Sequence, residues 1–220
     1  MSFNKRWFPC VLSALCLSIT IFGCASRPYR THSEFEMRFK GIRKPVLIVS
    51  DVRIYEISRV GLTELRDDWC AAAKRNLCNV ILANLRRKHY NAKPITVQEK
   101  LAKEMEEIQA LYRAVSRSIQ LHTYGPQLFP DKLRNFDYSL GPTEGILRKL
   151  GADSLVVVNA LGHISANRSK GSLSVSVADS SGTILWYSVK GSTGEYDLRD
   201  PERIVELVED ILSSFPEASG

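Results

Sequence analysis

Two continuous apolar runs, Val46–Val49 and Leu155–Val158, constrain the fold of this chain most strongly. Both runs are rich in β-branched residues, which is typical of strands that are covered on both faces of a sheet. Two long amphipathic helical patterns lie between them. The sequence therefore predicts the α/β class, with a mixed sheet and helices packed on it. The 220 residues provide enough apolar side chains for a single domain of this kind.

The first helical pattern is expected to begin near Thr63. Its apolar stripe consists of Leu65, Trp69, Ala73, Leu77, Ile81 and Leu85. Its basic end, residues 86–88, suits the helix dipole, although an anionic surface such as lipid head groups could also bind there.

The second helical pattern is the clearest in the chain. It starts with Thr96 and Glu99 in capping-box spacing and continues to Ile119. Its acidic residues precede Arg113 and Arg117, which is the order that the helix dipole favours. The narrow apolar stripe indicates packing on the protein's own sheet, or alternatively a seam against a partner helix.

Shorter patterns predict the remaining elements. Glu34–Lys40 alternates apolar with charged residues, which predicts a half-buried strand at the start of the ordered domain. A short helix is expected to end at Gly151, and a final helix to run from Asp200 as N-cap to just before Pro216. Between these helices, three strands are expected at Leu155–Gly162, Leu173–Ala178 and Thr183–Val189, the last two forming a hairpin.

The middle strand of this group has two different faces. Leu173, Val175 and Val177 alternate with Ser172, Ser174 and Ser176. One face is therefore expected to be buried, and the serine face to be either wet or covered by something polar.

The first 23 residues have the pattern of a secretory signal peptide. Lys5 and Arg6 precede an apolar segment, Val11–Phe22, and the small residues Gly23 and Cys24 follow it. The segment is shorter than the roughly 20 residues that a membrane-spanning helix needs. Residues 1–23 are therefore predicted to be a leader rather than a permanent anchor.

The leader ends on Ile21, Phe22, Gly23 and Cys24, which resemble the lipobox of bacterial lipoproteins. The resemblance implies that Cys24 carries acyl chains (palmitate among them) that hold the protein in a bilayer. It also implies placement at the periplasmic face of the outer membrane, because Ala25 stands where an Asp would retain the protein in the inner membrane. Residues 24–33 are then expected to be a flexible tether, and 34–216 a periplasmic α/β domain.

Two cysteines lie in the body of the chain. Cys70 and Cys78 are eight positions apart in one predicted helix, so their Cα atoms should be about 12 Å apart, beyond the reach of a disulfide. Two interpretations remain: small, buried apolar residues, or an intermolecular disulfide.

The sequence shows few signs of a catalytic, metal-binding or nucleic-acid-binding site. The net charge of +6 is not gathered into a basic stripe interleaved with aromatics, so nucleic acid is not an expected partner. The four histidines, His32, His89, His122 and His163, have no second metal ligand at helix or strand spacing, and no metal or cofactor is expected. No phosphate loop or nucleophile elbow is present in the sequence. The nearest approach to a cluster of catalytic carboxylates is the group Glu195, Asp197 and Asp200.

Residues 122–142 form the longest irregular connection in the pattern. Such loops are often functional, and this one carries the aromatic residues Tyr124, Phe129 and Tyr138. We predict that these three residues form an interaction surface.

The order of elements from Leu147 to Trp186 resembles a group of periplasmic assembly lipoproteins. In this group, a helix runs into a turn such as Gly151–Asp153, an apolar strand follows, and a polar hairpin comes next. The group includes the curli secretion lipoprotein and the amino-terminal domain of the Tol system's periplasmic protein.

The resemblance implies a non-enzymatic accessory subunit of an envelope assembly, export or cell-wall machine. Such a subunit would bind an envelope protein through the 122–142 loop or the serine-faced hairpin. Two alternatives are a glycan- or lipid-binding module that uses the loop aromatics, and a hydrolase. A hydrolase should show a cleft that gathers an acidic residue with His122 or His163.

Overall fold

The computed structural model describes residues 29–95, 99–124, 131, 134–193 and 197–218. Its described part contains a seven-stranded sheet in the order β1-β7-β6-β5-β2-β3, with β4 paired to β2 outside this path. The strands are β1 (Tyr29–Thr31), β2 (Pro45–Ile57), β3 (Thr63–Leu65), β4 (Lys93–Pro94), β5 (Ser154–Ser165), β6 (Arg168–Asp179) and β7 (Ile184–Thr193). β2 runs parallel to β4 and β5, and the other pairs are antiparallel.

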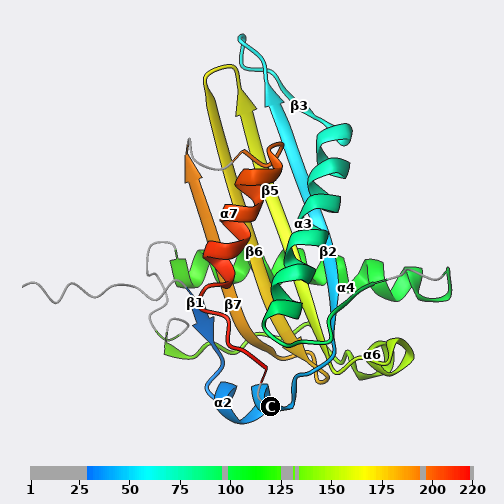
Figure 1. Ribbon diagram of the computed structural model, residues 1–220. Helices are drawn as coiled ribbons and strands as arrows, with labels where there is room; N and C mark the ends of the chain where they lie inside the picture. The colour runs from blue at the N-terminus through cyan, green and yellow to red at the C-terminus, as the bar shows by residue number, and fades with distance from the viewer. Residues whose placement is uncertain (1–28, 96–98, 125–130, 132–133, 194–196, 219–220) are drawn as a thin grey trace, which may run out of the picture.

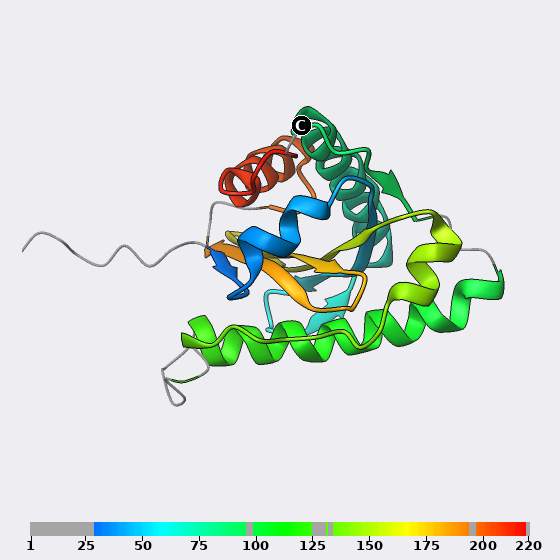
Figure 2. The same cartoon turned by 90° about the horizontal axis from the view of Figure 1, so that it is seen from below.

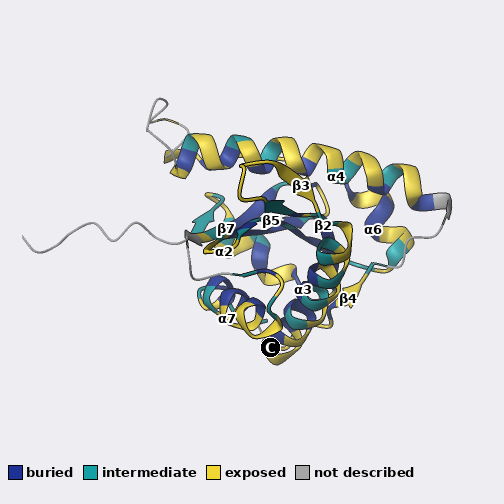
Figure 3. Cartoon of the chain, turned by 90° about the horizontal axis from the view of Figure 1, so that it is seen from above, coloured by how far each residue is buried: buried dark blue, intermediate teal, exposed yellow. Residues whose placement is uncertain are grey.

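Helices cover the sheet on both faces (Figures 1 and 2). Helices α3 (Asp67–Arg87) and α7 (Pro201–Leu212) pack on one face. Helix α4 (Glu99–Ile119), extended by a π-helical turn at Gln120–Tyr124, crosses the other face, with α6 (Glu144–Leu150) beside it (Figure 3). The predicted class, a mixed α/β sheet with packed helices, is confirmed. Within the described part of the chain, no helix combines the length and apolar character needed to cross a bilayer.

The alternation of side chains along the strands divides the interior into two cores. Leu47, Val158 and Trp186 belong to the core under α3 and α7, and Ile48, Val157 and Tyr187 belong to the core under α4. Because successive side chains of a strand point to opposite faces, strands buried on both faces read as continuous apolar runs. This explains why Val46–Val49 and Leu155–Val158 dominate the sequence pattern.

Several sequence predictions are confirmed. The second helix forms, although the capping residue Thr96 lies outside the described residues. Gly151 ends α6 in the left-handed conformation, with φ of 61°. The side chain of Asp200 caps α7 by accepting from the backbone N–H of Glu202 at 2.9 Å. The β6–β7 hairpin also forms, but its strands are longer than predicted.

The predicted strand at Glu34–Lys40 is wrong. Residues Phe35–Arg38 form a helical turn, α2, followed by a 3-10 turn. The same alternating pattern also fits a helical turn, because Phe35 and Phe39 are four positions apart and residues at this spacing lie on one face of a helix. Their ring centroids lie 4.5 Å apart and Phe39 is buried, whereas Met37 is 68% exposed.

Two boundaries also differ from the predictions. The ordered domain begins no later than Tyr29, because Tyr29–Thr31 of the expected tether pairs with β7 as β1. The first helix begins at Asp67 rather than near Thr63, because Thr63–Leu65 pairs with the end of β2 as β3. Pairing with a neighbouring strand is a tertiary interaction, and it overrides the local helical pattern.

A β-bulge divides β2 into two halves. The register with β5 shifts between Val49 and Asp51, which leaves Ser50 as the extra residue. The bulge exchanges the two faces of the strand beyond it. As a result Ile54 enters the core under α3, where it is fully buried, while Asp51 and Arg53 face the side of α4.

Candidate functional site

Helix α4 covers only part of the sheet face that it crosses. The strands β2, β5 and β6 extend well beyond the helix (Figure 1). Within the described residues, no helix lies over this extension. The cross-strand register therefore decides which side chains are covered by α4 and which remain open.

The rows of side chains across this face change from apolar to polar. The row Ile48, Val157, Ser176 and Tyr187 lies under α4 and is buried. The next row is Asp51, Asn159, Ser174 and Val189. Beyond it come the row Arg53, Leu161 and Ser172, and the row Tyr55, His163 and Lys170. The edge of α4 falls at the row of Asp51.

The serine face of β6 is mostly covered, not wet. Ser174 and Ser176 are buried beneath α4. The cover is polar, because Ser116 of α4 lies 3.4 Å from the Ser174 hydroxyl and 3.0 Å from the Tyr187 hydroxyl. Gln120 donates to the Tyr187 hydroxyl at 3.0 Å. The predicted alternative of a polar cover is confirmed, and this part of the hairpin is not available to a partner.

Two tyrosines are fully buried between α4 and the sheet. Burial raises the pKa of both Tyr112 and Tyr187, because the phenolate cannot be solvated there. A raised pKa in the folded state means that the unfolded chain releases these protons first, at about pH 10. Their contribution to stability is therefore complete below pH 10 and is lost as the pH rises above it.

We expect the free energy of unfolding to fall steeply above pH 10. Each buried tyrosine contributes a loss of about 1.4 kcal/mol per pH unit in this range. Urea unfolding measured between pH 9 and 11 tests this expectation. Tyr112→Phe should reduce the slope of the free energy of unfolding against pH by the contribution of one proton. Equal slopes in the variant and the wild type would contradict the raised pKa of Tyr112.

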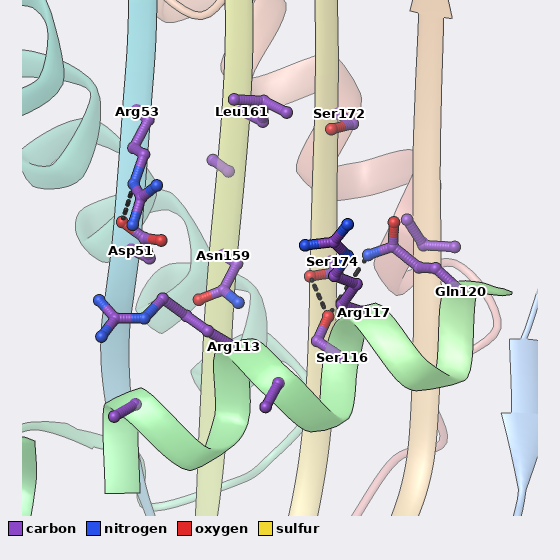
Figure 4. Close-up of a pocket in the computed structure, with 14 residues that line it drawn as sticks. Asp51, Arg53, Arg113, Ser116, Arg117, Gln120, Asn159, Leu161, Ser172 and Ser174 are labelled. Carbon is purple, nitrogen blue, oxygen red and sulfur yellow. Dashed lines mark hydrogen bonds and ion pairs between the residues drawn. The ribbon is translucent and has the colours of Figure 1, made fainter. Parts of the chain in front are cut away.

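The candidate site is the cleft at the open edge of α4, which we call the arginine cleft (Figure 4). It has a volume of about 530 Å³ and lies between α4 and strands β2, β5 and β6. Its charged side chains are Asp51, Arg53, Arg113 and Arg117, and its polar ones include Asn159 and Ser172. Ala110 and Ala114 keep the helix side of the cleft open, because their side chains are small.

The charges in the arginine cleft are unbalanced. Arg53 donates to Asp51 at 3.0 Å, and this carboxylate raises the pKa of Arg53. Arg113 and Arg117 are exposed and have no hydrogen bond or ion pair to any described residue. The side-chain oxygen of Asn159 is buried without a hydrogen-bond partner in the described structure. Three guanidinium groups thus face one carboxylate, which makes the cleft cationic.

The sheet beyond the cleft is an open surface, which we call the open sheet face: Tyr55, Leu161, His163 and Lys170. Leu161 is 41% exposed. The rings of Tyr55 and His163 stack with centroids 5.3 Å apart and an interplanar angle of 17°. Apolar and aromatic surface therefore continues directly from the cationic cleft.

The predicted aromatic surface is only partly described. Phe129 lies outside the described residues, as does the predicted lipidation site Cys24. The ring of Tyr124 lies 6.2 Å from that of Tyr187 and under the guanidinium of Arg30 at 5.7 Å. Tyr138 is half-buried and packs against Phe136, with centroids 5.2 Å apart. A role of these aromatics in binding stays a prediction.

None of the described groups considered for acid–base chemistry lines the arginine cleft. His122 contacts Ser118 at 3.2 Å, and His163 lies on the open sheet face. Asp197 pairs with Arg199 at 2.6 Å, and hydrogen bonding to this arginine lowers the pKa of Asp197. Asp200 caps α7. Glu195 lies outside the described residues, among which no cluster of three or more His, Cys, Asp or Glu could hold a metal.

Arg199 and Arg66 instead hold a loop and a hairpin against α3. Their guanidiniums lie on the Trp69 ring at 4.8 and 4.2 Å from its centroid. Arg66 also pairs with Glu56 of β2. The neighbouring Cys70 accepts a hydrogen bond from the backbone N–H of Ile54 at 3.2 Å, so these residues join α3 to β2. Both body cysteines are free thiols, in accord with the predicted spacing.

The arginine cleft was not predicted from the sequence. Arg113 and Arg117 were assigned to the charge order that suits the helix dipole, but the dipole accounts only for charges in the last turn. The signal that could have revealed the cleft is a change in the phase of the apolar–polar alternation after Val49. This change places Arg53 on the sheet face that α4 crosses, where the small side chains of Ala110 and Ala114 leave room.

Comparisons with known proteins add little. No protein-family model matches the chain, and no curated protein matches it either. Among solved structures, it is similar to the LpoB C-terminal domain from Salmonella enterica, with 17% sequence identity and a TM-score of 0.27. The match covers 72% of this chain and 93% of that chain. A likeness at this TM-score supports no inference about the fold or the function of this chain.

Proposed function

We propose that this protein is a lipid-anchored, non-enzymatic accessory subunit of an envelope assembly, export or cell-wall machine. It binds an envelope protein through the open sheet face and the adjoining arginine cleft. The observation that carries this proposal is that part of one sheet face has no helix over it within the described residues, although its strands are long.

The composition of the open sheet face favours a protein partner. An exposed aliphatic side chain, a stacked aromatic pair and cationic groups lie on one continuous, rigid surface. Protein interfaces combine apolar and aromatic contacts in this way and are enriched in arginine. The cleft offers guanidinium, carboxamide and hydroxyl groups, which bind and orient a partner.

The anchor supports the envelope location. The lipobox-like residues 21–24 imply acylation of Cys24, and β1 begins only five positions later. Five residues span at most about 18 Å of extended chain. The domain would therefore stand close to the outer-membrane surface, at its periplasmic face, and would engage partners near that surface.

Site-specific photo-cross-linking tests the proposed function. A photoreactive amino acid is placed at Leu161 of the tagged full-length protein in growing cells, and cross-linked proteins are identified by mass spectrometry. The matched control site is Val205, which is 38% exposed on α7 at the opposite face of the sheet.

We expect Leu161 to capture one envelope protein at high yield and Val205 not to capture it. Capture of the same protein from both sites would show that the open sheet face is not the interface. If neither site captures a protein, and only glycan or lipid follows the tagged protein in mild detergent, the binding-module alternative replaces this proposal.

A further inference from the structure

The arginine cleft has the chemistry of an anion-binding trough. Arg113 and Arg117 are four positions apart on α4, so they lie on one side of the helix, separated by about 6 Å along its axis. Both project over the strands at the edge of the cleft (Figure 4). The third guanidinium, Arg53, comes from β2 and already shares Asp51. Two cationic groups thus face the trough without a described acidic partner.

The helix dipole does not account for this arrangement. It favours cations in the last turn of a helix, where Arg117 lies, but its effect has faded one turn earlier, at Arg113. It has no bearing on Arg53, which stands on a strand. The bulge at Ser50 is what turns Arg53 toward the same trough. Convergence from two elements indicates a binding site rather than a solvated helix end.

We propose that the arginine cleft binds an acidic polypeptide segment of the envelope partner, with two carboxylates held by Arg113 and Arg117. This inference rests on the proposed function and names the chemistry of the partner. Guanidinium groups bind carboxylates through paired, charge-assisted hydrogen bonds. The exposed Leu161 and the methyl groups of Ala110 and Ala114 suit the apolar parts of a peptide better than a bare inorganic anion.

The spacing of the two arginines defines the expected segment. In an extended chain, side chains two positions apart lie on the same side, separated by about 6.7 Å. This distance is close to the separation of Arg113 and Arg117 along α4. An extended segment that lies in the trough along the helix would therefore present acidic residues at alternate positions.

The test uses the purified full-length protein in an uncharged detergent and a fluorescent twelve-residue peptide of alternating Glu and Thr. The matched peptide of alternating Gln and Thr controls for backbone contacts. Arg113→Gln together with Arg117→Gln removes the proposed clamp. Arg75→Gln together with Arg86→Gln removes the same charge from exposed positions of α3, which have no side-chain partner among the described residues.

We expect the Glu peptide to bind the wild type, and its affinity to fall about tenfold or more in the Arg113/Arg117 variant, as for the loss of two charge-assisted contacts. The α3 variant should keep the wild-type affinity, and the Gln peptide should not bind. Equal losses in both variants, or no loss in either, would overturn the inference. So would stronger binding of inorganic phosphate or phosphatidylglycerol vesicles through the same arginines.

The photo-cross-linking from Leu161, repeated in the Arg113/Arg117 variant, separates this inference from the proposed function. Undiminished capture of the partner would overturn the acidic-segment inference and leave the accessory role standing. Peptide binding that depends on the arginines, with no partner captured in the wild type, would instead count against the accessory role alone.

Discussion

Replacing Cys24 with alanine is expected to abolish acyl labelling and to release the protein from the membrane fraction. The lipobox resemblance implies three acyl chains on this residue, and each buried methylene contributes about 0.8 kcal/mol to membrane binding. Two chains already suffice for stable attachment. The acyl chains are therefore the anchor that this prediction tests.

The measurement is incorporation of labelled palmitate, together with fractionation of inner membrane, outer membrane and periplasm. Cys16→Ala is the matched control, since it removes another leader cysteine and leaves the lipobox-like residues intact. It should label and fractionate as the wild type does. Label retained by Cys24→Ala would show that the resemblance to a lipobox is misleading.

Inserting one alanine between Asp51 and Val52 is expected to leave little folded protein. If the bulge at Ser50 is kept, the half of β2 beyond the insertion exchanges its faces, so Arg53 enters the core under α3 and Ile54 faces α4. If the bulge is smoothed out instead, Asp51 enters that core. Burying either charge costs several kcal/mol even after relaxation, and a domain of this size is stable by only about 5–15 kcal/mol.

Deletion of Ser50 is the matched control, because Ser50 is the extra residue of the bulge. Without it β2 alternates regularly, and Asp51, Arg53 and Ile54 keep their faces and their partners on β5. The Ser50 hydroxyl is buried with no hydrogen-bond partner in the described structure, so the deletion breaks no side-chain hydrogen bond. Circular dichroism and urea unfolding compare the two variants with the wild type. A cooperative unfolding transition of normal midpoint in the insertion variant would show that β2 tolerates either register.

The sequence was most informative where burial is extreme. Strands covered on both faces must be apolar throughout, so Val46–Val49 and Leu155–Val158 stand out and predict the sheet. Caps such as Asp200 and Gly151 act within one turn of backbone, and they too were predictable. The lipidation of Cys24 stays a prediction, which rests on the linear pattern of a leader.

The sequence was least informative where two patterns coincide. Phe35 and Phe39 satisfy both a strand and a helical turn, and only packing against Phe215, at 5.4 Å from Phe39, selects the turn. Thr63–Leu65 could extend a helix, and only pairing with β2 makes it a strand. In both cases the contact with a partner distant in sequence, Phe215 or β2, contributes the free energy that decides the local structure. A local sequence pattern does not contain that partner.

By itself, then, the sequence determined the class of fold and the main helices, because each depends on local patterns. The address in the cell stays a prediction from the sequence. The tertiary structure alone decided the candidate site. Arg53 reaches the cleft through a bulge whose register is set by β5, and Arg113 and Arg117 face it because α4 crosses the sheet where it does. Arg53 and Arg113 are 60 positions apart in the sequence, so these charges converge only after the chain has folded.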